Sequence, residues 1–460
     1  MSTSSFAHRA NKTVAPADAE PFTALLHGPL LPSLIRLALP TVVVLFMTTL
    51  LSVAETYFVS SLGRDAIAAA SLVVPVMMLM TMVSNGGIGG GVSSAIARAK
   101  GAGRQDEAES LAWHSVVIAT LAGGLFSLAL LLAGPALYRG LGGNGRSLEQ
   151  AVLYSNILFG GAIPFWILML LQAALRGAGN VKVPALIMLG GVVAGLALSP
   201  LLITGRLGAP RMGVAGAGVA QVLCNIAALG VVIGYMRSAS STLRLHRYPL
   251  QRKHFSAILG VGLPSAINAV MSAMSVTALT AAAGAVSVDA IAGYGIASRL
   301  DMLLIPVMFG FGTAAITLVG TNLGAGDVAR ARRAAIVNVL FVAGLVGLVG
   351  LIVALFPQCW LGLFTSDAAV IAIGAQYLRV VAPFYAAIGV IFELYFAGQG
   401  ARHILWPMTA SVVRFLFALA AMALVVQGYA SLRTAFVLVA ASNVAAAAIS
   451  LLGFLRTRWD

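Results

Sequence analysis

Glu55 is the residue of this sequence that is best placed to do chemistry. It is an acid among apolar and hydroxyl-bearing neighbours, fifteen residues after Pro40. A low-dielectric environment disfavours the charged form of a carboxyl group, so Glu55 could take up a proton from one side of a membrane and release it when its surroundings change. We therefore predict that Glu55 couples a proton or cation to a conformational change. The structural alternative is a side chain that extends from the membrane interface into water.

Two further acids, Asp301 and Glu393, fall within apolar stretches that also contain cations. Buried charges are expected to pair. Arg299 is only two residues from Asp301, so these two side chains point to different faces of a helix. Asp301 or Glu393 is therefore predicted to pair with Arg414 from another helix. A structural pair, a proton relay and a substrate contact are all compatible with this prediction.

A proline and several bulky side chains suggest a hinge and a substrate cavity. Pro40 removes one helical hydrogen bond, so we predict a hinge there, with a static kink as the alternative. Flexible and aromatic side chains suit an adaptable cavity, although lipid contact or core packing is the expected role of most of them. The candidate cavity residues are Tyr57, Met78, Phe165, Gln172, Asn268 and Tyr385.

Motifs for other kinds of chemistry are absent from the sequence. It has no Walker phosphate-binding loop, no Gly-x-Ser-x-Gly elbow and no His-Glu-x-x-His pair, and its six histidines are dispersed. Cys224 and Cys359 lie in or beside apolar runs and predict neither a disulfide framework nor a metal site. We expect no enzymatic activity, no cofactor and no ATP-driven pumping.

The elements that must position these residues are membrane-spanning helices. Hydrophobic residues make up 60% of the chain and charged residues 9%. Backbone amides must be satisfied internally in hydrocarbon, and the runs are too long and too rich in Leu, Ala and Val for barrel strands. The predicted fold class is an all-α integral membrane protein with twelve spans. The spans are 33–60, 66–98, 109–137, 149–176, 181–204, 214–237, 253–284, 290–323, 331–356, 370–397, 404–428 and 433–456.

The distribution of Lys and Arg predicts the orientation of these spans. If the N-terminus is cytoplasmic, 19 of the 28 basic residues fall in cytoplasmic segments, six in external segments and three within spans. This asymmetry places both termini in the cytoplasm. The expected location is the inner membrane of a bacterium. The basic segment from Arg237 to Lys253 is interpreted as a topology determinant that contacts anionic lipids. A nucleic-acid site is not expected, because no binding module accompanies it.

The chain contains two similar halves, because several motifs recur in the same order. The pairs are Asp65-Ala-Ile-Ala68 with Asp289-Ala-Ile-Ala292, Pro40 with Pro264, Gly101-x-Gly103 with Gly324-x-Gly326, and Pro164-Phe165 with Pro383-Phe384, at offsets of 219 to 224. Six helices in each half make the repeat parallel. The predicted domains are a disordered cytoplasmic tail at 1–27, an N-terminal six-helix lobe at 28–237, a cytoplasmic linker at 238–256 and a C-terminal six-helix lobe at 257–460.

Such pseudo-symmetry suits a transporter, because two similar lobes can rock about a central site and open it to either side in turn. The structural alternative is a duplication that only records how the fold arose. Glu55 breaks the symmetry, since an offset of 224 places Leu279 at the corresponding position. Ion coupling is therefore predicted to reside in the first lobe.

Several of these segments resemble the multidrug and toxic compound extrusion (MATE) family. The resemblance runs from about Leu30 to the C-terminus and is carried by Leu37-Ala-Leu-Pro40, Ala54-Glu-Thr-Tyr-Phe-Val59, Gln172-Ala-Ala-Leu-Arg-Gly177 and Gly320-Thr-Asn-Leu-Gly-Ala-Gly326. It implies a V-shaped pair of six-helix lobes that expels amphipathic, often cationic compounds in exchange for protons or sodium. It also places Glu55 where the family usually has a first-helix Asp that serves as the cation or proton site.

The sequence departs from this family at four polar positions. The Asp that often precedes Pro in the fifth helix is Ser199 here, and its companion Asn is Gly195. The seventh-helix acid of sodium-coupled members corresponds to Ser272, and the tenth-helix Asp to Ala386. Because sodium coordination needs several oxygen ligands, these losses favour protons as the coupling ion.

Two alternative functions stay open. The first is a flippase for lipid-linked oligosaccharides or related lipids. Clusters of Arg at a lateral gate would favour this function, and this sequence has few of them. A non-transporting membrane scaffold or sensor would not require proline-kinked, pseudo-symmetric helices around an embedded acid. The predicted partners are small organic substrates and membrane lipids, with no nucleic acid, and the chain is predicted to be a monomer.

Overall fold

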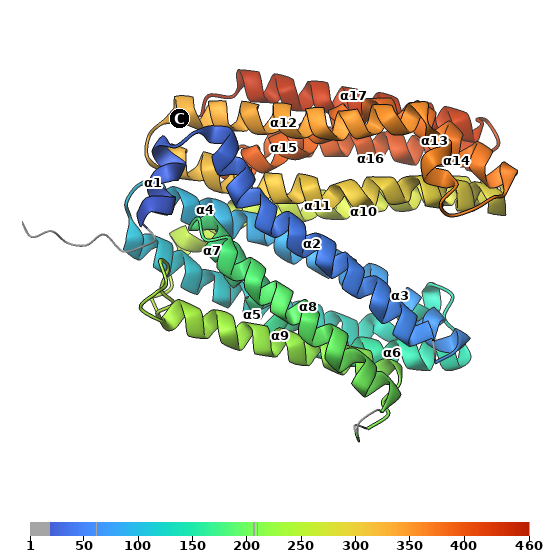
Figure 1. Ribbon diagram of the computed structural model, residues 1–460, viewed down its shortest axis with the longest axis horizontal. Coiled ribbons are helices and arrows are strands. Elements are labelled where there is room, and N and C mark those ends of the chain that lie inside the picture. The colour runs from blue at the N-terminus through green and yellow to red at the C-terminus, as the bar shows by residue number, and fades with distance from the viewer. Residues whose placement is uncertain (1–18, 61, 206–207, 209, 460) are drawn as a thin grey trace, which may run out of the picture.

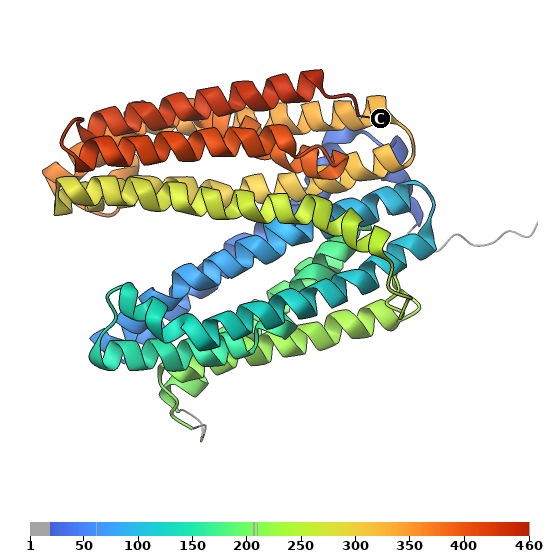
Figure 2. The same cartoon turned by 180° about the vertical axis from the view of Figure 1, so that it is seen from behind.

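Helices make up the regular secondary structure of the computed structural model, which describes residues 19–60, 62–205, 208 and 210–459. Figures 1 and 2 show the helices in two bundles. The first bundle contains α2 (Leu30–Ser60), α3 (Arg64–Thr81), the π-helical turn η1 (Met82–Ile88), α4 (Gly89–Gly101), α5 (Gln105–Gly140), α6 (Gly145–Gly160), α7 (Ala162–Gly177), α8 (Lys182–Thr204) and α9 (Val214–Arg237). The second contains α10 (Arg252–Val286), α11 (Val288–Gly324), α12 (Val328–Leu355), α13 (Pro357–Leu361), α14 (Ala368–Val381), the 3₁₀ turn η3 (Ala382–Phe384), α15 (Tyr385–Ala401), α16 (Leu405–Val426) and α17 (Leu432–Arg456).

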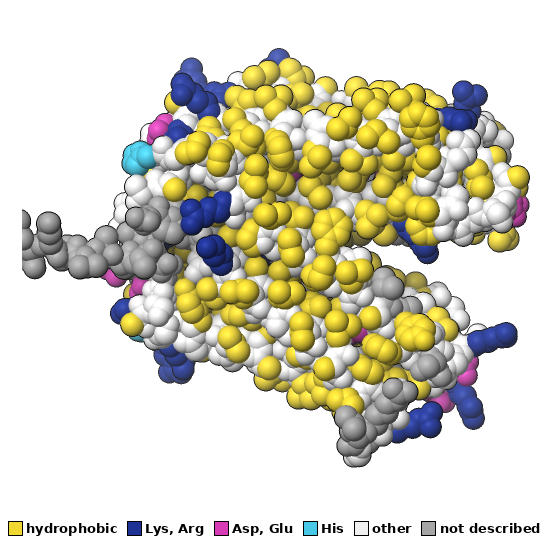
Figure 3. All heavy atoms as spheres, in the orientation of Figure 1, with side chains coloured by type: hydrophobic (Ala, Val, Ile, Leu, Met, Phe, Trp, Pro, Cys, Tyr) yellow, Lys and Arg dark blue, Asp and Glu magenta, His cyan; other side chains and the backbone are white. Residues whose placement is uncertain are grey.

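The helices are built to cross a membrane. Eleven described helical segments are long and apolar enough to do so, and α6 with α7, which meet at 49°, makes a twelfth if the bent pair is one span. Hydrophobic side chains cover the sides of both bundles, and many Lys and Arg side chains lie toward their ends (Figure 3). The prediction of an all-helical membrane protein is confirmed, because these apolar surfaces match a hydrocarbon environment.

The two bundles meet at one end of the molecule and diverge at the other (Figure 1). We name these the closed end and the open end. At the open end the space-filling view in Figure 3 shows a cleft between the bundles. The closed end carries α1 (Ala19–His27), the segment 238–251 and the C-terminus. It therefore gathers the segments that the charge distribution predicts to be cytoplasmic.

Residues 19–27 differ from the disordered tail expected for them, because they form helix α1. Leu25 is buried, and its carbonyl accepts a hydrogen bond from Asn322 Nδ2 of α11 at 3.2 Å. Burial of an apolar side chain and satisfaction of a backbone carbonyl together fix this helix against the second bundle. The remainder of the predicted tail, residues 1–18, lies outside the described residues.

The internal repeat is visible in the backbone of two turns at the closed end. Gly103 and Gly326 follow α4 and α11 with positive φ angles of 71° and 82°. Their amides donate to the carbonyls of Lys100 and Leu323, each at 3.0 Å. A left-handed residue after a helix favours glycine, so the repeated Gly-x-Gly motif encodes the same helix ending twice.

The halves differ in the helix that precedes each of these turns. In the first bundle α3 and α4 are joined by η1, whereas α11 of the second bundle continues unbroken past Pro306. Glycines let other helices approach η1 and α4 closely. A Cβ on Gly87 would lie 2.9 Å from Ala266 Cα, and one on Gly91 would lie 2.9 Å from the Gly262 nitrogen, both on α10. Since π turns often mark functional sites, this contact between the bundles is of particular interest.

Helix α2 belongs to both bundles. Near its start, Leu34 and Ala38 pack into the core of the second bundle, while Val59 near its end packs into the core of the first. Gly310 of α11 adjoins the stretch around Pro40, because a Cβ there would lie 3.3 Å from the Val42 nitrogen. Any relative motion of the bundles must therefore bend or slide α2.

Candidate functional site

Glu55 lies on α2, five residues before the helix ends near the open end of the molecule. Its side chain is half-buried. Tyr154 of α6 and Cys224 of α9 interact electrostatically with its carboxylate. Three helices of the first bundle therefore converge on one acid. A phenol and a thiol do not neutralise a carboxylate, so this environment suits the uptake of a proton or cation.

Helix α8 adds few polar groups beside this acid. Ser199 is fully buried, and its Oγ has no hydrogen-bond partner among the described residues. Gly195 adjoins α2, because a Cβ there would lie 3.3 Å from Leu51 Cδ2, one turn before Glu55. The absence of a side chain at Gly195 thus allows close helix packing at the point where a longer polar residue would supply a ligand.

Asp301 is held by tyrosines in the second bundle. The Tyr377 hydroxyl of α14 donates to Asp301 Oδ2 at 2.6 Å, and the Tyr385 hydroxyl of α15 donates to Oδ1. Arg414 of α16 interacts electrostatically with Asp301. The ion pair found among the described residues is Arg104 with Glu107, at 3.0 Å, so Asp301 and Arg414 do not form the direct pair that was predicted. Two phenol hydroxyls satisfy the carboxylate instead.

Glu393 also differs from the predicted pairing. It is completely buried on α15, and its Oε2 accepts a hydrogen bond from Asn338 Nδ2 of α12. No ion pair joins it to Arg414 in the part of the chain that the structure describes. A carboxyl group without a neighbouring cation is costly to bury in its charged form, so an amide partner is consistent with a neutral, structural group.

The residues predicted to line a substrate cavity do not share one environment. Tyr57 and Met78 are 73% and 53% exposed, and Phe165 is half-buried, all in the first bundle. Gln172 is fully buried, and neither polar atom of its side chain has a hydrogen-bond partner among the described residues. The Tyr385 hydroxyl donates a hydrogen bond to Asp301, and Asn268 is buried on α10. Their role in substrate binding stays a prediction.

A set of hydrogen bonds seals the closed end between the bundles. We call it the closed-end network, formed by Ser94, Arg98, Thr317 and Gln399 with their partners. Ser94 Oγ donates to the Gln399 carbonyl, and Arg98 Nη1 donates to the Gly400 carbonyl at 3.0 Å. Thr317 Oγ1 donates to the Arg176 carbonyl at 3.0 Å. Each of these bonds joins one bundle to the other.

Gln399 is the centre of this network. Its Nε2 donates to the Gly86 carbonyl of η1 at 3.1 Å and to Ser265 Oγ of α10 at 3.0 Å. A Cβ on Gly90 would lie 2.7 Å from its side-chain Cδ, so a side chain at residue 90 would displace the Gln399 amide from this position. Sequence reasoning missed this residue, which stands between Gly398 and Gly400.

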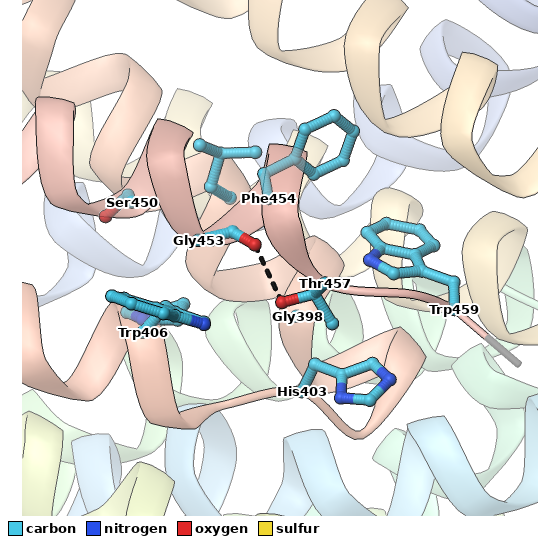
Figure 4. A pocket seen from close by; sticks show the side chains of 10 residues that line it. Gly398, His403, Trp406, Ser450, Gly453, Phe454, Thr457 and Trp459 are labelled. Carbon is cyan, nitrogen blue, oxygen red and sulfur yellow. Dashed lines mark hydrogen bonds between the residues drawn. The ribbon is translucent and has the colours of Figure 1, made fainter.

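Two hollows lie between side chains of the second bundle. Figure 4 shows one at the closed end of the second bundle, where Trp406, Ser450 and Trp459 lie around a cavity of about 20 Å³. This volume holds about one water molecule. A larger hollow of about 420 Å³ is bordered by Gln376, Arg379 and Arg433.

Comparison with known proteins identifies the chain. A model of the MatE family matches residues 40–201 and 264–425, which start 224 residues apart, as do Pro40 and Pro264. The "FAD transporter" of Shewanella oneidensis is 27% identical over 396 residues, covering 85% of this chain and 86% of that protein. The "Probable multidrug resistance protein NorM" of Thermotoga maritima is 27% identical over 440 residues, covering 93% and 92%.

A solved structure supports the same assignment. It is described as the outward-facing conformation of a multidrug resistance MATE family transporter of the MOP superfamily. It is 26% identical to this chain, with a TM-score of 0.84, over 94% of this chain and 97% of that one. The two-bundle fold and the repeated family match confirm the resemblance noted in the sequence. The chain therefore belongs to the MatE family of membrane transporters, which carry small organic compounds and are not enzymes.

Proposed function

We propose that the protein is a secondary antiporter that exports amphipathic organic compounds in exchange for protons. The observation that carries the proposal is the position of Glu55. It is an acid on α2, a helix that packs into both bundle cores. A change in its protonation can therefore alter α2 and, through α2, the relation between the bundles.

Substrate class and orientation are part of this proposal. One relative is named an FAD transporter and several are named multidrug resistance proteins, so large aromatic compounds are the candidates. The open cleft faces outward, the closed end and both termini face the cytoplasm of a bacterium, and the protein works as a monomer. The two lobes, at 28–237 and 257–460, rock about the cleft, joined by the linker at 238–256.

Transport by the purified protein in liposomes tests the proposal. With an imposed pH gradient, we expect exchange of protons for an aromatic cation such as ethidium or for FAD, measured separately. A sodium gradient of equal size should drive little exchange. Movement of a fluorescent lipid without either compound would support the flippase, and no movement of any of these would support a scaffold. Either result would reject the antiporter.

Pro40→Ala tests the hinge prediction. Pro40 lies where α2 contacts α11, before the helix passes to the other bundle. Alanine restores a helical hydrogen bond and makes bending more costly, by about 3 kcal/mol at most. We expect transport to slow by about tenfold or more while substrate binding changes little. Wild-type transport by Pro40→Ala would favour a static kink, and Pro75→Ala, in the exposed part of α3, is the matched control.

A further inference from the structure

The second bundle contains a hydrogen-bonded cluster around one acid. We call it the Asp301 cluster, formed by Tyr294, Asp301, Tyr377, Tyr385 and Arg414. Both carboxylate oxygens of Asp301 are engaged, because Tyr377 donates to Oδ2 at 2.6 Å and Tyr385 donates to Oδ1. The three residues come from α14, α15 and α11. One carboxylate thus joins three helical segments.

Packing fixes the two phenols that hold Asp301. Tyr294 of α11 meets Tyr377 edge to face, with ring centroids 5.3 Å apart. Phe436 of α17 lies 5.1 Å from Tyr377 and 6.3 Å from Tyr294. Tyr377 is 3% exposed and Tyr385 is completely buried, so neither hydroxyl has water as an easy alternative partner.

The charges around the cluster do not neutralise Asp301 through direct contact. Arg414 interacts electrostatically with Asp301 and Tyr377 but forms no ion pair with the acid in the described part of the chain. Other ionisable residues lie on the helices packed nearby: Arg36 and Glu55 on α2, Arg299 on α11, Arg379 on α14, Glu393 on α15 and Arg433 on α17. Arg299 and Arg379 are exposed, and Glu393 bonds with Asn338. Helices α4, α10 and α12 carry their basic residues near the closed end.

The position of the two tyrosines gives the cluster a mechanical role. Tyr377 belongs to α14 and Tyr385 begins α15, and the 3₁₀ turn η3, which contains Pro383, separates them. Proline removes a backbone donor and interrupts the helix here. Asp301 therefore bridges a break within a single membrane span, with one hydrogen bond on either side of the break.

A proton on Asp301 must change this bridge. A charged carboxylate accepts hydrogen bonds at both oxygens, whereas a protonated carboxyl group carries a donor hydrogen on one of them. The phenol at that oxygen then either rotates to accept this hydrogen or donates to a weaker, uncharged acceptor. Either change alters the hydrogen bond on one side of the break, so protonation of Asp301 is linked to the geometry between α14 and α15.

The first bundle lacks this arrangement. The offset of 224 places Met77 opposite Asp301, just as it places Leu279 opposite Glu55. Asp301 and Glu393 thus both lie within spans of the second bundle without an acidic counterpart in the first. This asymmetry would be unexpected if Asp301 only stabilised a shared fold, because the first half forms the same fold without it.

We propose that Asp301 is a second proton-binding site, separate from Glu55, and that its protonation controls the break between α14 and α15. The inference rests on the proposed exchange of protons for substrate and adds a second protonatable group to it. Two carboxyl sites, one in each lobe, allow proton uptake to act on both lobes of the transporter. The proton is the only ligand that this site requires.

Difference infrared spectroscopy tests the proposal directly, because a protonated carboxyl group has its own C=O stretching band. The full-length protein in lipid nanodiscs is titrated between about pH 5 and about pH 9, a range that spans perturbed carboxyl groups. Glu55→Gln should leave one titrating band, and Glu55→Gln/Asp301→Asn should lose it. Persistence of the same band in the double variant would overturn the proposal.

The tyrosines supply a second and milder test. Tyr377→Phe and Tyr385→Phe each keep the ring but remove a donor to the charged carboxylate, so the midpoint of the Asp301 band should move up by about one pH unit. Tyr138→Phe is the matched control, since this buried phenol hydrogen-bonds with Ser155 in the first bundle. Equal midpoints in all three variants would contradict the assignment, even if Asp301→Asn failed to fold.

The transport assay separates this inference from the proposed function. If Glu55→Gln abolishes proton-driven export but no band depends on Asp301, the antiporter stands and the second site is rejected. If the Asp301 band titrates but no pH gradient drives export, the second site stands and the antiporter is rejected.

Discussion

Replacement of Glu55 by Gln is expected to abolish export driven by a pH gradient, lowering its rate by at least about tenfold. Glutamine has nearly the same shape but cannot exchange a proton. A ligand that binds two conformations equally cannot shift the equilibrium between them. Without a titrating group at residue 55, the proton cannot bind one conformation of α2 more tightly than the other, so the pH gradient no longer drives the change. The measurement is proton-driven efflux from proteoliposomes, with substrate affinity determined separately.

The prediction also specifies the direction in which substrate affinity should change with pH. If a cationic substrate and a proton compete for Glu55, affinity rises as pH rises, because ionised Glu55 becomes more abundant. Binding should then release protons into the medium. In Glu55→Gln the affinity should depend much less on pH over the same range, and proton release should fall. A pH-dependent affinity retained in full by this variant would show that another group couples the proton.

Two substitutions serve as controls for the Glu55 experiment. Glu55→Asp keeps the carboxylate and places the residue type that the family usually has there, so it should retain export. Glu149→Gln removes an exposed acid of α6 near the same end of the molecule and should leave export within about twofold. Loss of export in Glu149→Gln would point to surface charge rather than to the coupling site.

Most of the fold could be predicted from the sequence, because long apolar runs are a strong signal of membrane-spanning helices. The repeat was accessible for a related reason. A Gly-x-Gly helix ending, such as that at Gly101 and Gly324, imposes a backbone conformation that few other residues adopt. The fourth span was less predictable, since α6 and α7 meet at 49° without an interruption in the apolar run. The docked helix α1 was missed because its burial depends on a distant partner, Asn322.

The candidate sites were only partly accessible. An acid in an apolar run is conspicuous in a sequence, so Glu55, Asp301 and Glu393 could be selected. Their partners could not, because tyrosine and asparagine are ordinary residues in membrane helices and pairing depends on how helices pack. Charge complementarity suggested Arg414 for Asp301, whereas geometry supplied two phenol hydroxyls. Gln399 was overlooked for the same reason, since its importance comes from contacts across the two bundles.

Replacement of Gly324 by Val should open the closed end and slow transport. Gly324 ends α11 where it meets α4, and a Cβ there would lie 2.9 Å from both Cα and the carbonyl carbon of Arg98. Gly101, its counterpart in the repeat, meets Thr321 in the same way, with a Cβ 2.8 Å from the carbonyl carbon. Each helix end therefore rests against the backbone of the other bundle, and neither place has a flexible side chain that could move aside.

The size of this effect follows from the rigidity of the contact. Overpacking a close-packed interface costs about 1–3 kcal/mol, and here the cost falls on the state in which the bundles touch. A bias of this size changes the ratio of two conformations by roughly 5- to 150-fold. Because alternating access needs both states, a protein that rarely closes this end should bind substrate but export it slowly.

Thiol labelling measures the change without relying on transport. In a background of Cys224→Ala and Cys359→Ala, Ser94→Cys places a probe in the closed-end network, where Ser94 is fully buried. A water-soluble maleimide should react with it markedly faster when Gly324→Val or Gly101→Val is present. Gly344→Ala is the matched control, because a Cβ there meets open space on α12. Unchanged labelling in both valine variants would mean that these glycines do not set the closed state, and that the hydrogen bonds of Gln399 hold the bundles together without them.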